Sequence, residues 1–500
     1  MKKLLLLSAL LIFACSSDDE GNPCIYEPTL STEAVTDITE TSATLNGIIA
    51  IVSENCDVPN NAEQGFVYST EIQPTLEDIQ VNVNGTNIST TIEGLVPNTT
   101  YYVRSFLTNN LGDFYGNEID FTTEDNGGEP TDCDVVYLDE NGVTIKACES
   151  ANIGDVGTVN GVQYTVVDRE MLDQMLLNEE DVTKVCTTRI TDLSYMTINT
   201  NNYELYAFSQ SFNQDISSWD VSNVTTMRGM FWGAMYFNQP IGNWDVSNVT
   251  NMSGMFLSAE FFNQDINTWN VGNVENMSNM FNSAYTFNQP IGNWDVSSVT
   301  DMREMFFNNA TFNQPIGNWV VSSVTYMGGM FRRTTAFNQP IGNWDVSSIT
   351  NMEFMFRNAE SFNQDIGNWD VSSVTTMLGM FLGVSVFNQP IGNWDVSNVT
   401  DMFRMFAGNS VFNQPIGNWD VSNVTNMGEL FYRATSFNQP IGNWDVSNVT
   451  NMELMFSNTS VFNQNIGNWA VDNVTNCLSF SFNTPQWTLP QPNFTNCNPN

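Results

Sequence analysis

The sequence predicts a mixed α/β solenoid of 25-residue repeats, preceded by an all-β sandwich. The stretch "FNQPIGNWDVSNVTNM" at 237–252 recurs letter for letter at 412–427 and 437–452. Eleven Phe-Asn-Gln triplets, from Phe212 to Phe462, follow one another at steps of 25 residues without an insertion. Upstream, short alternating apolar runs between turn residues are typical of antiparallel strands. A constant period indicates units that stack on near-identical neighbours.

The N-terminus predicts export and a lipid anchor. In residues 1–14, two lysines precede an apolar run that is too short to span a bilayer, as in a signal peptide. The letters "LIFAC" at 11–15 resemble the lipobox of bacterial lipoproteins, which implies lipidation of Cys15; an ordinary signal peptide is the alternative. The following "SSDDE" resembles the acidic tag of Bacteroidetes-type lipoproteins. We therefore expect attachment to the outer membrane of a Gram-negative bacterium, facing the cell exterior.

The charge balance excludes several function classes. The chain has 14 Lys+Arg against 55 Asp+Glu, a net charge of −41, and no histidine. Such a surface repels phosphate backbones and anionic lipids, so we expect no nucleic-acid binding and membrane contact only through the anchor. Without histidine, the commonest general base and transition-metal ligand are missing. We expect a non-enzymatic monomer without a cofactor, calcium being the one metal that the acidic residues would suit.

Seven cysteines remain after Cys15, and their separations suggest three disulfides. The expected pairs are Cys24–Cys56, Cys133–Cys148 and Cys477–Cys497, which leaves Cys186 free. Cys133 and Cys148 flank "VVYLDENGVTIKA", two expected strands around a turn that would bring the cysteines together.

Three regions are expected before the repeats. Residues 15–29 form a tether and 30–123 a β-domain, while 124–134, rich in Gly, Pro and acidic residues, form a linker. Within the β-domain, "LVPNTTYYVR" at 95–104 resembles the E–F corner of fibronectin type III domains. This resemblance implies a sandwich in which the Tyr101 hydroxyl bonds to nearby backbone.

Caps are expected at both ends of the repeats. Residues 135–211 contain a strand pair, a helical apolar spacing in "REMLDQMLLNEED", and "ITDLSYM", which echoes the later "VTNMSGM". We expect this region to cover the first repeat. Residues 482–500 return to Cys497 and form the C-terminal cap of the repeats, which span 212–481.

Each repeat is predicted to hold one strand and one short helix. In the second repeat, Ile241, Trp244 and Val246 have the IxxWxV spacing of a leucine-rich-repeat strand. Val249, Met252, Met255, Phe256 and Ala259 follow at three- and four-residue steps, which favours a helix with one apolar side.

The whole repeat unit resembles the 25/26-residue repeat of BspA-like bacterial surface proteins, relatives of leucine-rich repeats. The resemblance implies a right-handed solenoid on the cell exterior that serves adhesion. It transfers no catalytic residues.

Aspartates recur after most of the tryptophans. Stacked carboxylates could hold calcium, but we favour Asx turns that close over the next two residues. The Trp column is expected in the core, rather than as an exposed carbohydrate platform, and the Asn-Gln pairs are expected to bond loop backbone, rather than sugar. The aspartates are Asp220, Asp245, Asp295, Asp345, Asp370, Asp395, Asp420 and Asp445.

Residues that vary between repeats are the candidate binding surface, because packing does not hold them constant. We expect an adhesion or binding scaffold for an extracellular protein or glycan; the alternatives are a polysaccharide-binding or polysaccharide-acting component and a purely architectural envelope or matrix protein. The candidate binding residues are Arg228, Trp232, Arg303, Arg332, Arg333, Arg404, Tyr432 and Arg433.

Overall fold

The computed structural model describes residues 25–54, 63–109, 112–123, 133–199, 204–205 and 209–499. The expected signal peptide, the expected lipidation site Cys15, the expected Cys24–Cys56 pair and most of the expected tether and linker lie outside these residues. The chain divides into two compact units, Met1–Gly128 and Glu129–Asn500. The described part contains no helix with the length and apolarity that a bilayer crossing needs.

The first unit is a β-sheet domain, as expected. One antiparallel sheet has the order β1-β2-β5, and the other has the order β4-β3-β6-β7 with β8 also paired to β6. The strands are β1 (Ile25–Thr36), β2 (Ser42–Glu54), β3 (Glu63–Ser69), β4 (Ile79–Asn82), β5 (Asn87–Glu93), β6 (Thr100–Asn109), β7 (Gly112–Tyr115) and β8 (Ile119–Thr122).

Both sheets of this domain contribute to one apolar core. Leu45 of β2 and Ile88 of β5 share a cluster with Phe66 of β3 and Val103 of β6. Side chains alternate between buried and exposed along β5, the pattern of a strand with one face in the core. The expected corner is present, since the backbone N of Val96 donates to the Tyr101 hydroxyl at 3.0 Å.

The second unit begins with short paired strands and one helix. The expected hairpin around residues 139–144 and the expected helix are both present. The Asp168 side chain caps that helix by accepting from the Met171 N–H. The elements are β9 (Val136–Leu138), β10 (Ile145–Ala147), β11 (Val156–Val159), β12 (Val162–Val166), α1 (Arg169–Leu177), β13 (Val185–Cys186), β14 (Ile198–Asn199), β15 (Glu204–Leu205) and the 3-10 turn η1 (Ser209–Ser211).

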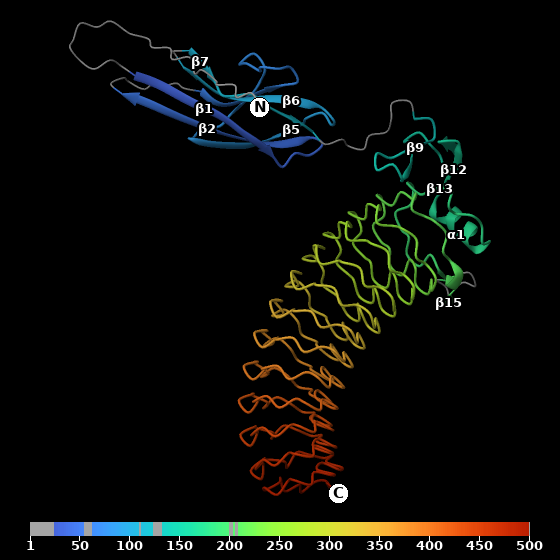
Figure 1. Cartoon of the computed structure of the whole chain (residues 1–500), viewed down its shortest axis with the longest axis vertical. Helices are drawn as coiled ribbons and strands as arrows, with labels where there is room; N and C mark the ends of the chain where they lie inside the picture. Colours follow the sequence, from blue (N-terminus) through green and yellow to red (C-terminus); the bar gives the residue numbers. More distant parts are fainter. Residues whose placement is uncertain are drawn as a thin grey trace, which may run out of the picture. The chain divides into compact units, whose positions relative to one another are not determined.

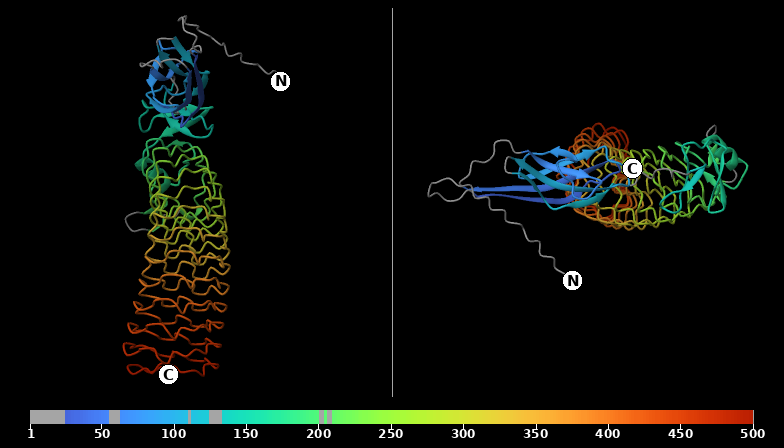
Figure 2. Two further views of the ribbon diagram at one scale, coloured as in Figure 1. Left: turned by 90° about the vertical axis from the view of Figure 1, so that its left-hand side faces the viewer. Right: turned by 90° about the horizontal axis from the view of Figure 1, so that it is seen from above.

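Eleven 25-residue repeats follow, and each lies directly on the one before it in every view (Figures 1 and 2). We number them 1 to 11 from Phe212. Single parallel bridges join equivalent residues of consecutive repeats, from Thr226↔Asn251 to Asn451↔Asn476. Asp192 of the echo "ITDLSYM" pairs with Thr226 in the same way. One apolar cluster runs from Val167 to Trp487, so the region before repeat 1 shares the core of the repeats.

The predicted mixed α/β solenoid with a leucine-rich-repeat-like coil is wrong. The repeats contain neither an α-helix nor a regular strand; α1 is the one α-helix among the described residues. The expected strand is a turn, in which the Trp244 N–H donates to the Ile241 carbonyl at 3.2 Å. A second turn follows, closed by Val249 N–H to the Val246 carbonyl at 2.9 Å.

The expected helix is replaced by consecutive turns, which we call the turn segment (residues 251–259 in repeat 2 and their equivalents). Its fourth and eighth residues have positive φ in all eleven repeats, as at Gly254 (61°) and Ser258 (58°). The N–H groups of Gly254, Phe256 and Ser258 donate to carbonyls of repeat 3 rather than to their own turn. A helix is excluded because it would need negative φ and internal hydrogen bonds throughout.

The predicted core residues are nevertheless buried. Met252, Met255, Phe256 and Ala259 are fully buried, since the turns place residues three and four apart on one side, as a helix would. Phe256 stacks on Phe262 with a ring-centroid distance of 3.9 Å, and the same contact recurs along the repeats.

Candidate functional site

The residues that all repeats share are committed to packing. The eleven tryptophans from Trp219 to Trp469 are at most 5% exposed. Each indole N–H donates to a carbonyl one layer back, as Trp344 does to Ile316 at 3.2 Å. The Trp column therefore lies in the core and offers no exposed platform for a sugar.

The Asn-Gln pairs form a ladder between repeats. The Asn338 side-chain oxygen accepts from the Asn363 N–H at 3.0 Å and from the Gln364 side-chain amide at 2.9 Å. Equivalent bonds recur from Asn213 to Asn463. These amides satisfy loop backbone, as favoured from the sequence.

The aspartates form the Asx turns that we favoured over calcium. All eight accept a hydrogen bond from the backbone N–H two residues on, as Asp345 does from Ser347 at 3.1 Å. Hydrogen bonds from the Ser hydroxyl and then the Ser N–H lower the pKa of Asp295, Asp345, Asp370, Asp420 and Asp445. Within the described residues, no group of three or more acidic or cysteine side chains could hold a metal ion.

Two of the expected disulfides lie within the described residues. Cys133 pairs with Cys148 and Cys477 with Cys497, both with Cα–Cα distances of 5.9 Å. Cys186 is free and buried, and burial raises the pKa of its thiol.

The candidate binding residues all lie on turn segments, and most of them contact an aromatic ring. Arg228 lies over Tyr195 at 5.2 Å, and the Trp232 ring is 6.4 Å from the same ring. At the other end of the row, Arg433 lies over Tyr432 at 5.0 Å.

Two of the candidate arginines are paired with acids. Arg303 binds Asp301 at 2.6 Å, and Arg404 binds Glu429 with two hydrogen bonds of 2.6 and 2.8 Å. In each pair, the carboxylate neutralises much of the positive charge of the arginine.

The remaining candidates, Arg332 and Arg333, gather with a residue that the sequence reasoning missed. Arg357 lies close enough to both for their charges to lower its pKa, although burial is the larger cause. Arg332 lies over Phe307 at 4.8 Å and over Phe354 at 5.3 Å, and Arg357 lies over Phe354 at 5.2 Å. The signal was available, because Arg357 follows Arg332 by one period. We call Arg332, Arg333 and Arg357 the arginine cluster.

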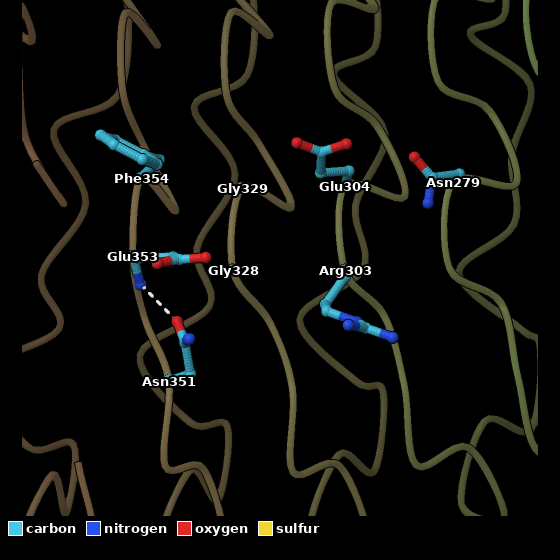
Figure 3. A pocket seen from close by; sticks show the side chains of 8 residues that line it. All are labelled: Asn279, Arg303, Glu304, Gly328, Gly329, Asn351, Glu353 and Phe354. Atoms are coloured by element: carbon cyan, nitrogen blue, oxygen red, sulfur yellow. Dashed lines mark hydrogen bonds between the residues drawn. The ribbon is translucent and has the colours of Figure 1, made fainter. Parts of the chain in front are cut away.

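A hollow of about 300 Å³ lies beside this cluster (Figure 3). Gly328 and Gly329 of repeat 5 leave it open, because the flanking repeats carry larger side chains at these two positions. Phe354 both lines the hollow and stacks with the cluster, and Glu304 both lines it and pairs with Arg332 at 3.7 Å. The lining residues are Asn279, Arg303, Glu304, Gly328, Gly329, Asn351, Glu353 and Phe354.

Comparisons with known proteins identify the repeats. The family described as "Mycoplasma protein of unknown function, DUF285" matches three times, at residues 200–306, 286–391 and 375–488. No curated protein and no solved structure matches the chain significantly. The three matches together span residues 200–488, more than half of the 500 residues, so the chain belongs to the DUF285 family.

Proposed function

We propose that the protein is a non-enzymatic binding scaffold, held by a lipid on Cys15 at the outer face of a Gram-negative outer membrane. It binds an extracellular protein or glycan, as a monomer, through the variable residues of the turn segments. One observation carries this proposal. The repeated apolar residues are buried in the core, whereas the variable arginines and aromatic residues of successive repeats are half-buried or exposed. A surface of this kind can be varied without loss of the core.

Two features of the sequence support the setting and the role. The lipobox-like and acidic-tag residues favour display outside the cell. The likeness of the repeat unit to BspA-like surface proteins favours adhesion, although the backbone of these repeats is not that of a leucine-rich repeat.

The binding role is tested by screening the full-length protein against arrays of glycans and extracellular-matrix proteins. We expect selective binding that weakens when Arg332, Arg333 and Arg357 are replaced together. A control variant replaces Lys184, an exposed positive residue outside the turn segments. A blank screen with the folded protein would favour an architectural role.

The anchor is tested in intact cells that produce the protein. We expect an added protease to degrade it from outside, and Cys15→Ser to release it from the membrane fraction. Protection in intact cells but not in lysed ones would place the protein in the periplasm.

A second candidate function, polysaccharide cleavage, is favoured by one observation: Glu304 and Glu353 both line the hollow. Glycosidases need two carboxylates that flank the scissile bond. Reducing-end release from polysaccharides by the protein, lost in Glu353→Gln but kept in Glu453→Gln, would favour this activity over simple binding.

A further inference from the structure

The arginine cluster is a concentration of positive charge on a strongly acidic chain. The chain has 14 Lys+Arg and a net charge of −41, yet three arginines gather on repeats 5 and 6. Within the described residues, Arg333 and Arg357 form no salt bridge, and Arg332 has only Glu304, at 3.7 Å. Like charges held together in a folded protein favour an anion between them.

The cluster is also held ready for such an anion. The Nε atoms of Arg332 and Arg357 are buried and have no hydrogen-bond partner among the described residues. Phe307 and Phe354 pack against the guanidinium groups of Arg332 and Arg357, which helps to hold these planar groups in place. Supported guanidinium groups bind carboxylate or sulfate through paired hydrogen bonds.

The hollow next to the cluster indicates what carries the anion. Its volume of about 300 Å³ is at the small end of ligand pockets. Asn351 and Glu353 of its lining offer acceptors for hydroxyl groups, whereas the Phe354 ring extends away from Gly328 and Gly329, over Gly379 of repeat 7. A small hollow lined mostly by polar side chains suits a sugar ring with its several hydroxyl groups. A terminal acidic sugar carries a single negative charge, whereas the acidic surface would repel a polyanion.

We propose that the arginine cluster and the adjoining hollow bind a terminal acidic sugar of a glycan, with its carboxylate on the arginines and its ring in the hollow. This inference rests on the proposed binding function and names the class of ligand for one site.

The test uses calorimetric titration of the full-length protein with a glucuronate-terminated disaccharide and with its glucose-terminated counterpart. We expect the acidic disaccharide to bind about tenfold more tightly or better, and its affinity to fall as salt is added.

The variants are taken from equivalent positions of other repeats, so that they suit the fold. Arg333→Asn introduces the residue found at Asn308 and Asn358, which share its positive φ. Arg357→Leu introduces the residue found at Leu382. Each should weaken binding of the acidic disaccharide about tenfold.

Two more variants separate the contributions of charge and hollow. Lys184→Asn, which removes an exposed positive charge outside the turn segments, should leave binding unchanged. Gly328→Leu, which introduces the residue of Leu378 into the hollow, should weaken disaccharide binding but not binding of inorganic sulfate. Melting curves check that each variant is folded.

Equal affinity for the acidic and the neutral disaccharide would overturn the inference, and so would an equal loss in Lys184→Asn. If inorganic sulfate binds but neither disaccharide does, the cluster is an anion site and the proposal of a sugar ligand is overturned. If neither disaccharide binds but the array screen finds another ligand, the inference fails and the proposed function stands. If no ligand on the array binds, both this inference and the proposed binding function fail.

Discussion

At the scale of single residues, the close stacking of the repeats explains the glycine of the "IGNW" motif. A Cβ atom on Gly392 would lie 2.2 Å from the carbonyl oxygen of Pro415 in the next repeat. No rotamer change relieves such a contact, since both partners are backbone. Glycine avoids this contact in nine of the eleven repeats, whereas Ser217 and Asn267 occupy the equivalent position in repeats 1 and 3.

We expect Gly392→Ala to destabilise the protein by about 1–3 kcal/mol, the usual cost of overpacking. Chemical denaturation followed by tryptophan fluorescence measures this change. Gly272→Ser is the control, because most repeats carry serine at that position, as at Ser247 and Ser297. An unchanged stability in Gly392→Ala would show that the repeats can separate at no cost.

The Asx turns predict a pH dependence of stability. Hydrogen bonds from the following serine lower the pKa of Asp345 in the folded state. Its contribution to stability is therefore complete above the unfolded pKa of about 3.9 and is lost as the pH falls through the lower folded value. The effect at each turn is small because these carboxylates are solvent-exposed.

Thermal melts at about pH 7 and about pH 2.5 test this dependence. We expect Asp345→Ala to melt below the wild type at the higher pH, and the difference to shrink at the lower pH. A difference that persists in acid would assign the role of Asp345 to packing instead.

At the scale of elements, the structure differs from the sequence prediction at the turn segment. Apolar residues at three- and four-residue steps predicted a helix, and they are buried as that helix would bury them. The spacing could not show that the backbone N–H groups donate to carbonyls of the next repeat. Positive φ at the fourth and eighth residues allows the N–H groups to reach the next repeat. Residues as different as Gly254, Phe354 and Arg404 occupy the fourth position, so the residue type there does not predict the positive φ.

Gly254→Ala distinguishes the turn segment from a helix by the sign of its effect. In a helix the substitution would stabilise by about 1 kcal/mol. At the observed φ of 61° we expect it to destabilise by about 1–2 kcal/mol. No clash contributes, because the nearest atom to the new Cβ would lie 3.8 Å away. Equilibrium unfolding measures the sign, and a gain in stability would contradict the turn.

The candidate site shows the same limit. Five of the eight candidate residues are arginines that lie over an aromatic ring. The sequence identified them because they vary between repeats while the neighbouring residues do not. Arg357 was missed although it follows Arg332 by one period. The hollow was missed because it is lined by side chains of different repeat positions, whose meeting depends on the turn geometry.

At the scale of the whole molecule, stability depends on contacts between neighbouring repeats. Each repeat uses the same bridge, Asn-Gln and indole bonds to the next one, and one core runs through all of them. A whole repeat can therefore be removed without changing the type of any contact that the shared residues make.

We expect deletion of residues 412–436, one complete repeat, to leave a folded protein with cooperative unfolding and an intact arginine cluster. Deletion of residues 412–423, about half a repeat, should place unlike residues on one another and abolish the fold beyond the deletion. Circular dichroism melts and size-exclusion chromatography distinguish the two. Loss of folding in both would mean that repeat 9 holds contacts that the other repeats do not share.

The sequence by itself determined the period, the buried residues, the Asx turns and the position of the variable surface, because identical residues at a constant spacing must meet identical neighbours. The tertiary structure decided the backbone conformation and the grouping of Arg332, Arg333 and Arg357 beside the hollow. Both depend on bonds and contacts between residues about one period apart, and the local spacing within a repeat carries no information about these partners.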